Sequence, residues 1–219
     1  MPVLFLCKKK STKTLCLFKR KILSLFSVIV TLLLLYIEKM KTIIETLPCT
    51  LFRGIRNTSP LQVLDLLAVL NEIRSDRYRS TIEQIRSEAM PSKSKLKEAL
   101  PGFTPTGTFS HRSTQGLVEY NGCVCLDIDR VESAESLKSV CKNLHWVFAA
   151  FVTPSGQGLK VLVKTNSSLA SYKQTEERVA EAFKCATGYE RDSHCKDIAR
   201  IQFVSYDPLA YINVNAITF

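Results

Sequence analysis

The hydrophobic and polar positions divide this chain of 219 residues into three parts. The first part, residues 1–39, contains an uncharged stretch over 22–37 that is rich in Leu, Ile and Val. In the second part, 40–100, apolar residues recur at helical spacing, which predicts helices. In the third part, 101–219, short apolar runs are separated by Gly, Pro and Asn, a pattern typical of strands and turns.

Three helices are predicted in the second part of the chain. The first starts at Ser59-Pro60, where a serine cap precedes a proline that suits the first helical turn. The second opens at Asp76, and the third covers 94–100. The arginines of the first two helices are most simply interpreted as a solvent-exposed face. These residues are Arg74, Arg77, Arg79 and Arg86.

The third part has the order strand, helix, strand, strand, helix, strand. The predicted elements cover 122–130, 134–144, 146–153, 159–164, 169–186 and 201–204. A tight turn over 154–158 makes 146–164 a hairpin. The short antiparallel elements indicate the α+β class, and their order is that of ferredoxin-like and RNA-recognition-like units. We therefore expect one such core sheet with flanking helices, preceded by the helical segment.

The strand over 122–130 ends in two carboxylates, Asp127 and Asp129. Side chains two apart in a strand point to the same face, so the two acids lie side by side. Their mutual repulsion is costly unless a cation, a proton or basic groups offset it, and Mg²⁺ or Mn²⁺ is the natural partner of such oxygens. The alternative is a strand end that runs into a solvated turn, where Asp is common.

A glycine-rich turn is the second candidate for chemistry. Gly156 and Gly158 allow backbone N–H groups to approach an anion, and Ser155 and Lys160 add a hydroxyl donor and a positive charge. This combination suits a triphosphate, although a plain hairpin turn has the same composition. It is not a Walker loop, because the glycine spacing and the Lys-Ser/Thr ending are absent.

A third polar segment covers residues 192–208. It places Asp197, Arg200, Ser205 and Asp207 around the last predicted strand. Either of these two acids is able to complete a metal site. Arg200 is suited to clamp a phosphate, or it simply pairs with Asp197.

The charge of the chain is concentrated in its leader. The net charge is +10, but residues 1–39 hold eight Lys/Arg and one Glu, whereas the remaining residues contribute only +3. The overall basicity is therefore not a DNA-binding footprint. The eight cysteines form neither a zinc-binding pattern nor a disulfide framework, and the adjacent His194-Cys195 is not spaced for chelation. Reduced thiols and a cytoplasmic location are expected.

Two interpretations of the leader remain open. Lys19-Arg20-Lys21 followed by the apolar stretch 22–37 is compatible with a single-pass membrane anchor. That topology would place a thiol-rich body outside the cytoplasm. The alternative is that Met40 is the true start, so that residues 1–39 are not translated and no membrane is involved.

Taken in order, the three polar features resemble the VirE N-terminal-like domain of Bacteroides-type mobile-element proteins, a branch of the archaeo-eukaryotic primase, or primase-polymerase, superfamily. The resemblance covers roughly residues 50–215. The matching residues are Leu100-Pro101, Gly107-Thr-Phe109, Leu126-Asp-Ile-Asp129, Thr153-Pro-Ser-Gly-Gln-Gly-Leu-Lys160, Asp197-Ile-Ala-Arg200, and Phe203-Val-Ser-Tyr-Asp-Pro208 with Tyr211 and Asn213.

The resemblance implies a metal-dependent nucleotidyltransferase that acts on a nucleic-acid template and primer with nucleoside triphosphates. In that superfamily an Asp-x-Asp motif and a later acid bind two Mg²⁺ or Mn²⁺ ions. Carried over, Asp127 and Asp129 form the first motif, and Asp197 is the third ligand, with Asp207 as its alternative. The implied substrate-binding residues are Ser155, Gly156, Gly158, Lys160, Arg200 and Ser205. A separate helicase-like ATPase is an implied partner.

One departure from the family pattern and two rival functions accompany this interpretation. The second motif of the superfamily ends in His, whereas the turn here ends in Lys160. A catalytically inactive nucleotide- or nucleic-acid-binding module, in a membrane-anchored form if residues 1–39 are translated, is therefore the alternative. A nuclease is disfavoured, because Gln157 and Lys160 are three apart where the common nuclease core needs two.

Overall fold

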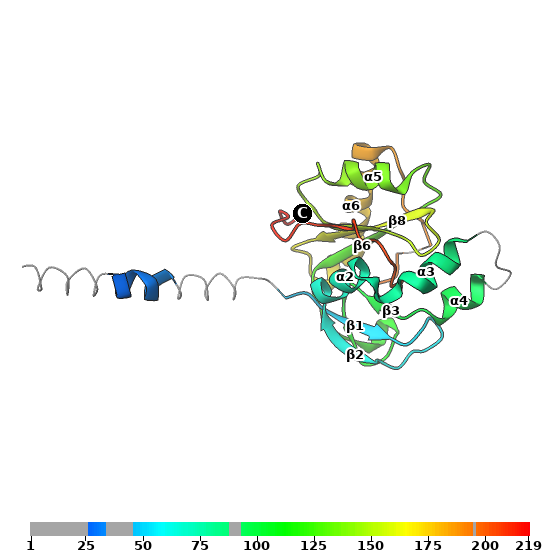
Figure 1. The fold of residues 1–219 in the computed structure, drawn as a ribbon, viewed down its shortest axis with the longest axis horizontal. Coiled ribbons are helices and arrows are strands. Elements are labelled where there is room, and N and C mark those ends of the chain that lie inside the picture. Colours follow the sequence, from blue (N-terminus) through cyan, green and yellow to red (C-terminus); the bar gives the residue numbers. More distant parts are fainter. Residues whose placement is uncertain (1–25, 34–45, 88–92, 195) are drawn as a thin grey trace, which may run out of the picture. The chain divides into compact units, whose positions relative to one another are not determined.

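Two four-stranded antiparallel sheets organise the body of the protein (Figure 1). The structure is a computed structural model that describes residues 26–33, 46–87, 93–194 and 196–219. The first sheet has the order β2-β1-β3-β9, with β1 at Pro48–Phe52, β2 at Gln62–Asp65, β3 at Gly102–Thr104 and β9 at Gln202–Phe203. The second has the order β10-β7-β8-β6, with β6 at Cys123–Asp129, β7 at Val147–Val152, β8 at Gly158–Lys164 and β10 at Tyr211–Ile212.

Helices and one small hairpin complete the body. The hairpin pairs β4 (Gly107–Phe109) with β5 (Leu117–Tyr120). The helices are α2 (Leu66–Arg74), α3 (Arg79–Arg86), α4 (Lys93–Ala99), α5 (Ala134–Cys141) and α6 (Tyr172–Thr187). Antiparallel sheets with separate helices confirm the predicted α+β class.

The leader is described only over residues 26–33, which form a helix with exposed side chains. Within the described part of the chain, no helix is both long and apolar enough to cross a membrane. The remaining leader residues, including half of the proposed anchor and Met40, lie outside the described residues, as does Cys195.

The predicted helix start at Ser59-Pro60 is wrong. Residues 62–65 form the edge strand β2, which pairs with β1, so that Asp65 lies opposite Pro48. Helix α2 begins directly after this strand, and the Asp65 carboxylate caps it by accepting a hydrogen bond of 2.7 Å from the Leu67 N–H. Pairing with a strand distant in the sequence decides the conformation here, and this pairing leaves no local signal.

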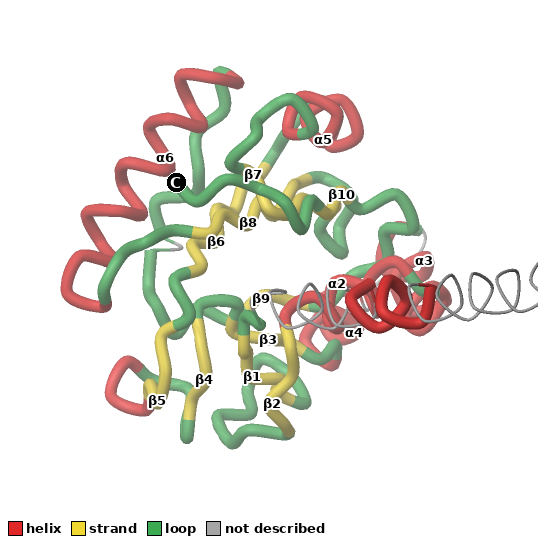
Figure 2. Tube along the Cα trace, turned by 90° about the vertical axis from the view of Figure 1, so that its left-hand side faces the viewer, coloured by secondary structure: helices red, strands yellow, loops and turns green. Residues whose placement is uncertain are grey.

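The second sheet separates two hydrophobic cores. Val124, Leu126 and Ile128 of β6 pack in a core with residues of α5 and α6. Cys123 and Cys125 of the same strand belong to a core shared with the first sheet and α2. Figure 2 shows α5 and α6 on one side of the second sheet and the first sheet on the other. This arrangement confirms the alternation predicted for β6.

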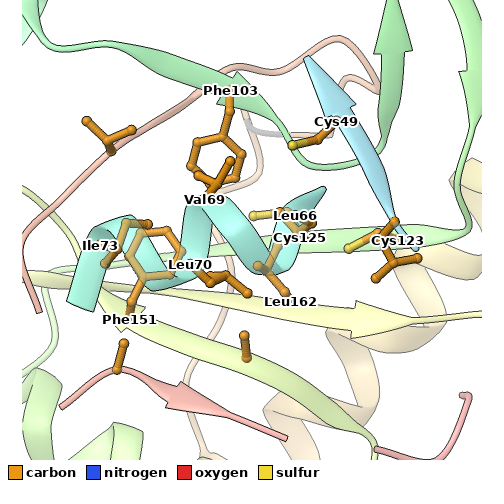
Figure 3. Packing of buried hydrophobic residues seen from close by; sticks show 14 of the residues in the cluster. Cys49, Leu66, Val69, Leu70, Ile73, Phe103, Cys123, Cys125, Phe151 and Leu162 are labelled. Carbon is orange, nitrogen blue, oxygen red and sulfur yellow. The ribbon is translucent and has the colours of Figure 1, made fainter. Parts of the chain in front are cut away.

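The core between the sheets is built around helix α2. Leu66, Val69, Leu70 and Ile73 of this helix are fully buried. Figure 3 shows them packed between Phe103 of the first sheet and the second-sheet residues Phe151 and Leu162. Arg74, Arg77 and Arg79 are exposed, as predicted for the helical arginines, and Arg74 also donates hydrogen bonds of 2.6 and 3.0 Å to the Ala210 carbonyl.

The strands and helices of the second sheet follow one another in the predicted order, except for the last predicted strand. Strand β8 lies between β6 and β7 and is antiparallel to both, and β7 and β8 form the predicted hairpin. The last predicted strand, 201–204, is present as β9 but pairs with β3 of the first sheet. A single four-stranded ferredoxin-like sheet is therefore not what forms. Gly102 permits the β3–β9 contact, because a Cβ there would lie 2.5 Å from the Ile201 side chain.

A buried ion pair joins α5 to the C-terminal segment. Lys138 donates hydrogen bonds of 2.8 and 2.7 Å to the two carboxylate oxygens of Asp207, and both side chains are almost fully buried. The same carboxylate accepts hydrogen bonds from the N–H groups of Val152, at 2.9 Å, and Leu209, at 3.1 Å. All these donors hold the Asp207 carboxylate in the protein interior.

We predict that Lys138→Met lowers the free energy of unfolding by about 3–5 kcal/mol, because it leaves the buried Asp207 charge without its partner. Urea denaturation measures this change. Glu135→Gln is the matched control, because Glu135 also contacts Lys138 but is 63% exposed. Its removal should cost about 0–1 kcal/mol. Equal effects of the two substitutions would contradict the importance of the buried pair.

Candidate functional site

Strand β6 presents Asp127 and Asp129 on the face that borders the core between the sheets. Asp127 is buried, whereas Asp129 is exposed at the end of the strand. In the β6–β8 register Asp127 lies opposite Lys160, and Asp129 lies opposite Gly158. The structure therefore brings together four of the residues predicted from two separate motifs.

Lys160 is an ion-pair partner of Asp127. Its ammonium group contacts the Asp127 carboxylate, and both side chains are buried. Lys160 lies between Asp127 and Phe151 in the strand register. Its charge is therefore directed at the carboxylate pair and not into the glycine-rich turn. Separating the two charges without a replacement would be strongly unfavourable in this buried position.

The pKa of the Asp129 carboxyl group reflects its burial and nearby charges of both signs. Burial of its carboxyl group raises the pKa above its ordinary value, and the neighbouring charges of Asp127 and Asp192 raise it further. The ammonium groups of Lys160 and Lys97 act in the opposite direction but do not cancel the shift. A divalent cation at this position would relieve the repulsion.

Asp192 and Lys97 are the residues of this environment that the sequence did not assign. The Asp192 N–H donates a hydrogen bond of 2.7 Å to the Asp127 carbonyl, which fixes residue 192 beside β6. A buried ion pair between Arg191 and Glu176 of α6 anchors the same loop. The acid-rich segment 192–208 was the only available signal for Asp192, because a contact between distant segments has no sequence pattern.

The glycine-rich turn is a hairpin turn whose backbone groups bond mainly to one another. The Gly156 N–H donates to the Thr153 carbonyl at 2.9 Å, and the Thr153 N–H donates to the Gly158 carbonyl at 2.9 Å. Gly156 has a φ of 80°, which favours glycine. Ser155 is exposed, and its hydroxyl lies 3.2 Å from that of Thr153.

Gly158 leaves space for the second carboxylate. A Cβ at this position would lie 2.7 Å from the Ile128 carbonyl oxygen and 3.2 Å from Oδ1 of Asp129. Any side chain at 158 would therefore displace β6 or the Asp129 carboxylate. Gly158, predicted to allow the approach of a phosphate, permits the close approach of strand and carboxylate in this structure.

Arg86 of α3 contacts the glycine-rich turn. The prediction that its side chain is solvent-exposed was wrong. Its guanidinium donates hydrogen bonds of 3.1 Å to the carbonyls of Thr153 and Tyr206, and one of 3.5 Å to the hydroxyl of Ser205. Ser205 is fully buried. In this structure Ser205 thus contacts Arg86 and helps to connect α3, the turn and the C-terminal segment.

The other predicted site residues have different surroundings. The Asp197 carboxylate accepts hydrogen bonds from the Ala199 N–H at 3.0 Å and the Thr114 hydroxyl at 3.4 Å. Arg200 is exposed, and among the described residues no ion pair joins it to Asp197. Asp207 is held by Lys138 in the interior. No hydrogen bond or ion pair observed for Asp197, Arg200 or Asp207 joins them to the carboxylates of β6.

The carboxylates of β6 fit a hard cation as a two-carboxylate site. Within the described ranges, no group of three or more His, Cys, Asp or Glu residues is arranged to hold a metal. Mg²⁺ is, however, commonly held by one or two carboxylates together with substrate phosphates and water. Asp127 and Asp129 supply oxygen donors of that type, and burial, together with the charges of Asp127 and Asp192, raises the pKa of Asp129.

The pKa of Asp129 yields a prediction for the metal-free protein. The folded state binds the Asp129 proton more tightly than the unfolded state, so stability falls as pH rises from about 3.9 through the raised pKa. At pH 7 in EDTA, Asp129→Asn should therefore raise the free energy of unfolding, by less than about 1 kcal/mol because the exposed group is screened. The gain should shrink below pH 4.

Denaturation of the two proteins at both pH values measures this difference. The matched variant Asp127→Asn should lower the free energy of unfolding, because it removes the partner of the buried Lys160. A loss of stability in Asp129→Asn at pH 7 would contradict the proposed charge balance.

Residues 95–212 match the family model described as BT4734-like, N-terminal domain. This match covers β3 to β10, and therefore both carboxylates, Lys160 and the loop that carries Asp192. Comparison with curated proteins gave no match. Comparison with solved structures gave none either.

Proposed function

The chain belongs to the BT4734-like N-terminal domain family, and from its carboxylate site we propose that it is a metal-dependent nucleotidyltransferase of the primase-polymerase type. The observation that carries the proposal is the pair Asp127 and Asp129 on one face of β6, with Lys160 opposite. Paired carboxylates beside a lysine suit a metal-bound triphosphate. The VirE-like sequence motifs support the same class.

The arrangement of the second sheet also supports the proposal. Strands β6, β7 and β8 with helix α5 have the split β-α-β order that the resemblance leads us to expect of a primase-polymerase core. The last predicted strand of that unit, β9, pairs with β3 of the first sheet. The likeness to the expected core therefore extends to the three strands β6, β7 and β8.

In the proposed reaction Asp127 and Asp129 would hold Mg²⁺ or Mn²⁺, and the ion would supply neutralisation of the triphosphate charge and activation of the primer hydroxyl. The residues of the chain orient these groups. Lys160 would contact a phosphate oxygen of the bound triphosphate in place of the Asp127 carboxylate, because an ammonium binds phosphate as a point charge. Gly158 keeps the Asp129 carboxylate accessible.

We propose that Asp192 adds negative charge beside this two-carboxylate site, while its own carboxylate accepts a hydrogen bond of 2.9 Å from the His194 N–H. Its backbone is bonded to Asp127, and its charge acts on Asp129. Asp207 is held by Lys138, and Asp197 by Thr114 and the Ala199 N–H. We further propose a nucleic-acid template and primer as partners, a separate helicase-like ATPase as a functional companion, and action in the cytoplasm on mobile-element DNA.

A second candidate function is an inactive module that binds nucleotides or nucleic acid. The observation in its favour is the buried Asp127–Lys160 pair, because a charge-neutral pair needs no metal. The sequence also lacks the histidine of the second superfamily motif. In this alternative, binding by the basic and glycine-rich residues would survive loss of the carboxylates.

Template-dependent nucleotide incorporation tests the proposal. The full chain is given template, labelled nucleoside triphosphates and Mn²⁺ or Mg²⁺. We expect product from the wild type and at least a ~100-fold lower rate from Asp129→Asn, because loss of a charge-stabilising ligand removes transition-state stabilisation of about 3 kcal/mol or more. Asp197→Asn is the matched control and should retain activity.

Two results would contradict this function. Equal product from the wild type and Asp129→Asn would exclude the metal site. Absence of product from a wild type that still binds the oligonucleotide would favour the inactive module. Since Asp129→Asn should not destabilise the protein, loss of its activity is not explained by unfolding.

A further inference from the structure

Arg130, the residue that directly follows Asp129, has an unusual backbone conformation. Its φ is 55°, and it is the only residue other than glycine with a positive φ in the part of the chain that the structure describes. A side chain in this left-handed region crowds the following carbonyl and costs free energy. Such outliers are often found at functional sites, where the surroundings enforce them.

The turn itself does not require an arginine. At three other left-handed positions, φ is between 77° and 80°, and each is occupied by glycine, at 122, 156 and 188. Directly after Arg130, the Val131 N–H donates a hydrogen bond of 3.2 Å to the carbonyl of Gln157 in the turn between β7 and β8. Glycine or asparagine would make the same turn at lower conformational cost.

The side chain of Arg130 makes no contribution to the fold that the structure records. It is exposed, and no hydrogen bond, ion pair or ring contact joins its guanidinium to another described residue. A guanidinium is therefore available at the exposed end of the carboxylate strand.

We infer that Arg130 is a phosphate-binding residue of the Asp127–Asp129 site. The inference rests on the proposed function, because it takes the ligand of the site to carry phosphate. A planar guanidinium binds two phosphate oxygens at once, which a lysine cannot do. The phosphate belongs either to the triphosphate of an incoming nucleotide or to the backbone of a nucleic acid.

Binding measurements on the full chain test this role with two probes. One is a non-hydrolysable nucleoside triphosphate with Mn²⁺, and the other is a fluorescein-labelled single-stranded oligonucleotide in EDTA. Arg130→Gly should weaken binding of one probe or both by roughly tenfold, the usual effect of losing charge-assisted hydrogen bonds. Arg130→Lys, which keeps the charge, should restore part of the affinity. The probe that responds identifies the source of the phosphate.

The stability of the variants separates a binding role from a structural one. In urea, Arg130→Gly should be at least as stable as the wild type, because glycine removes the left-handed strain. Weaker binding without loss of stability supports the inference, whereas a large loss of stability would identify a structural residue and overturn it. Lys173→Ala removes a charge from an exposed lysine of α6 and should leave binding unchanged.

The remaining outcomes distinguish this inference from the proposed function. If the wild type binds a probe and Arg130→Gly binds it equally well, the role of Arg130 is overturned while the proposed function stands. If the wild type binds neither probe, both are overturned. An equal loss in Arg130→Gly and Lys173→Ala would show a general charge effect and would also overturn the specific role.

Discussion

The buried ion pair of Asp127 and Lys160 is the interaction on which the second sheet and its site depend. Two charged groups in the interior are tolerated only while they stay together. Because they face each other across β6 and β8, they oppose any slip of one strand by one residue, which would turn the charge of that strand toward the apolar core of α5 and α6 and away from its partner. The pair thereby fixes Asp129 opposite Gly158.

This constraint leaves the site with an imbalance of charge. One lysine compensates one carboxylate, while the second carboxylate is brought close to Asp127 and Asp192 and has a raised pKa. A carboxylate in such unfavourable surroundings indicates function more clearly than one whose charge is fully paired. It identifies a position where a cation, free or bound to phosphate, would add stability. Proteins commonly carry such destabilising features at functional sites.

The sequence predicted the parts of the fold that rest on local pattern. Alternation along β6 placed Asp127 and Asp129 on one face, and the Gly156 turn defined the hairpin of β7 and β8. It could not predict β1 and β2, or the transfer of β9 to the first sheet, because these pairings join distant segments. The Lys138–Asp207 pair, 69 residues apart, explains why Asp207 was a plausible ligand in sequence yet has another partner in the structure.

In the site, too, short local motifs were predictable and contacts between distant segments were not. The two carboxylates and Lys160 belong to two short sequence motifs, and the structure brings these motifs together. Asp192 and Lys97 reach the site through a loop after α6 and through helix α4, and neither has a sequence pattern that connects it to β6. The left-handed conformation of Arg130 is likewise visible only in the folded backbone.

Mn²⁺ binding, followed by the electron paramagnetic resonance signal of the free ion, tests the central claim most directly. The account predicts that the full chain binds Mn²⁺, that a nucleoside triphosphate strengthens this binding because its phosphates complete the coordination, and that Asp129→Asn abolishes the effect. Identical titrations of the wild type and Asp129→Asn, or no binding even with saturating triphosphate, would contradict a metal-nucleotide site at the end of β6.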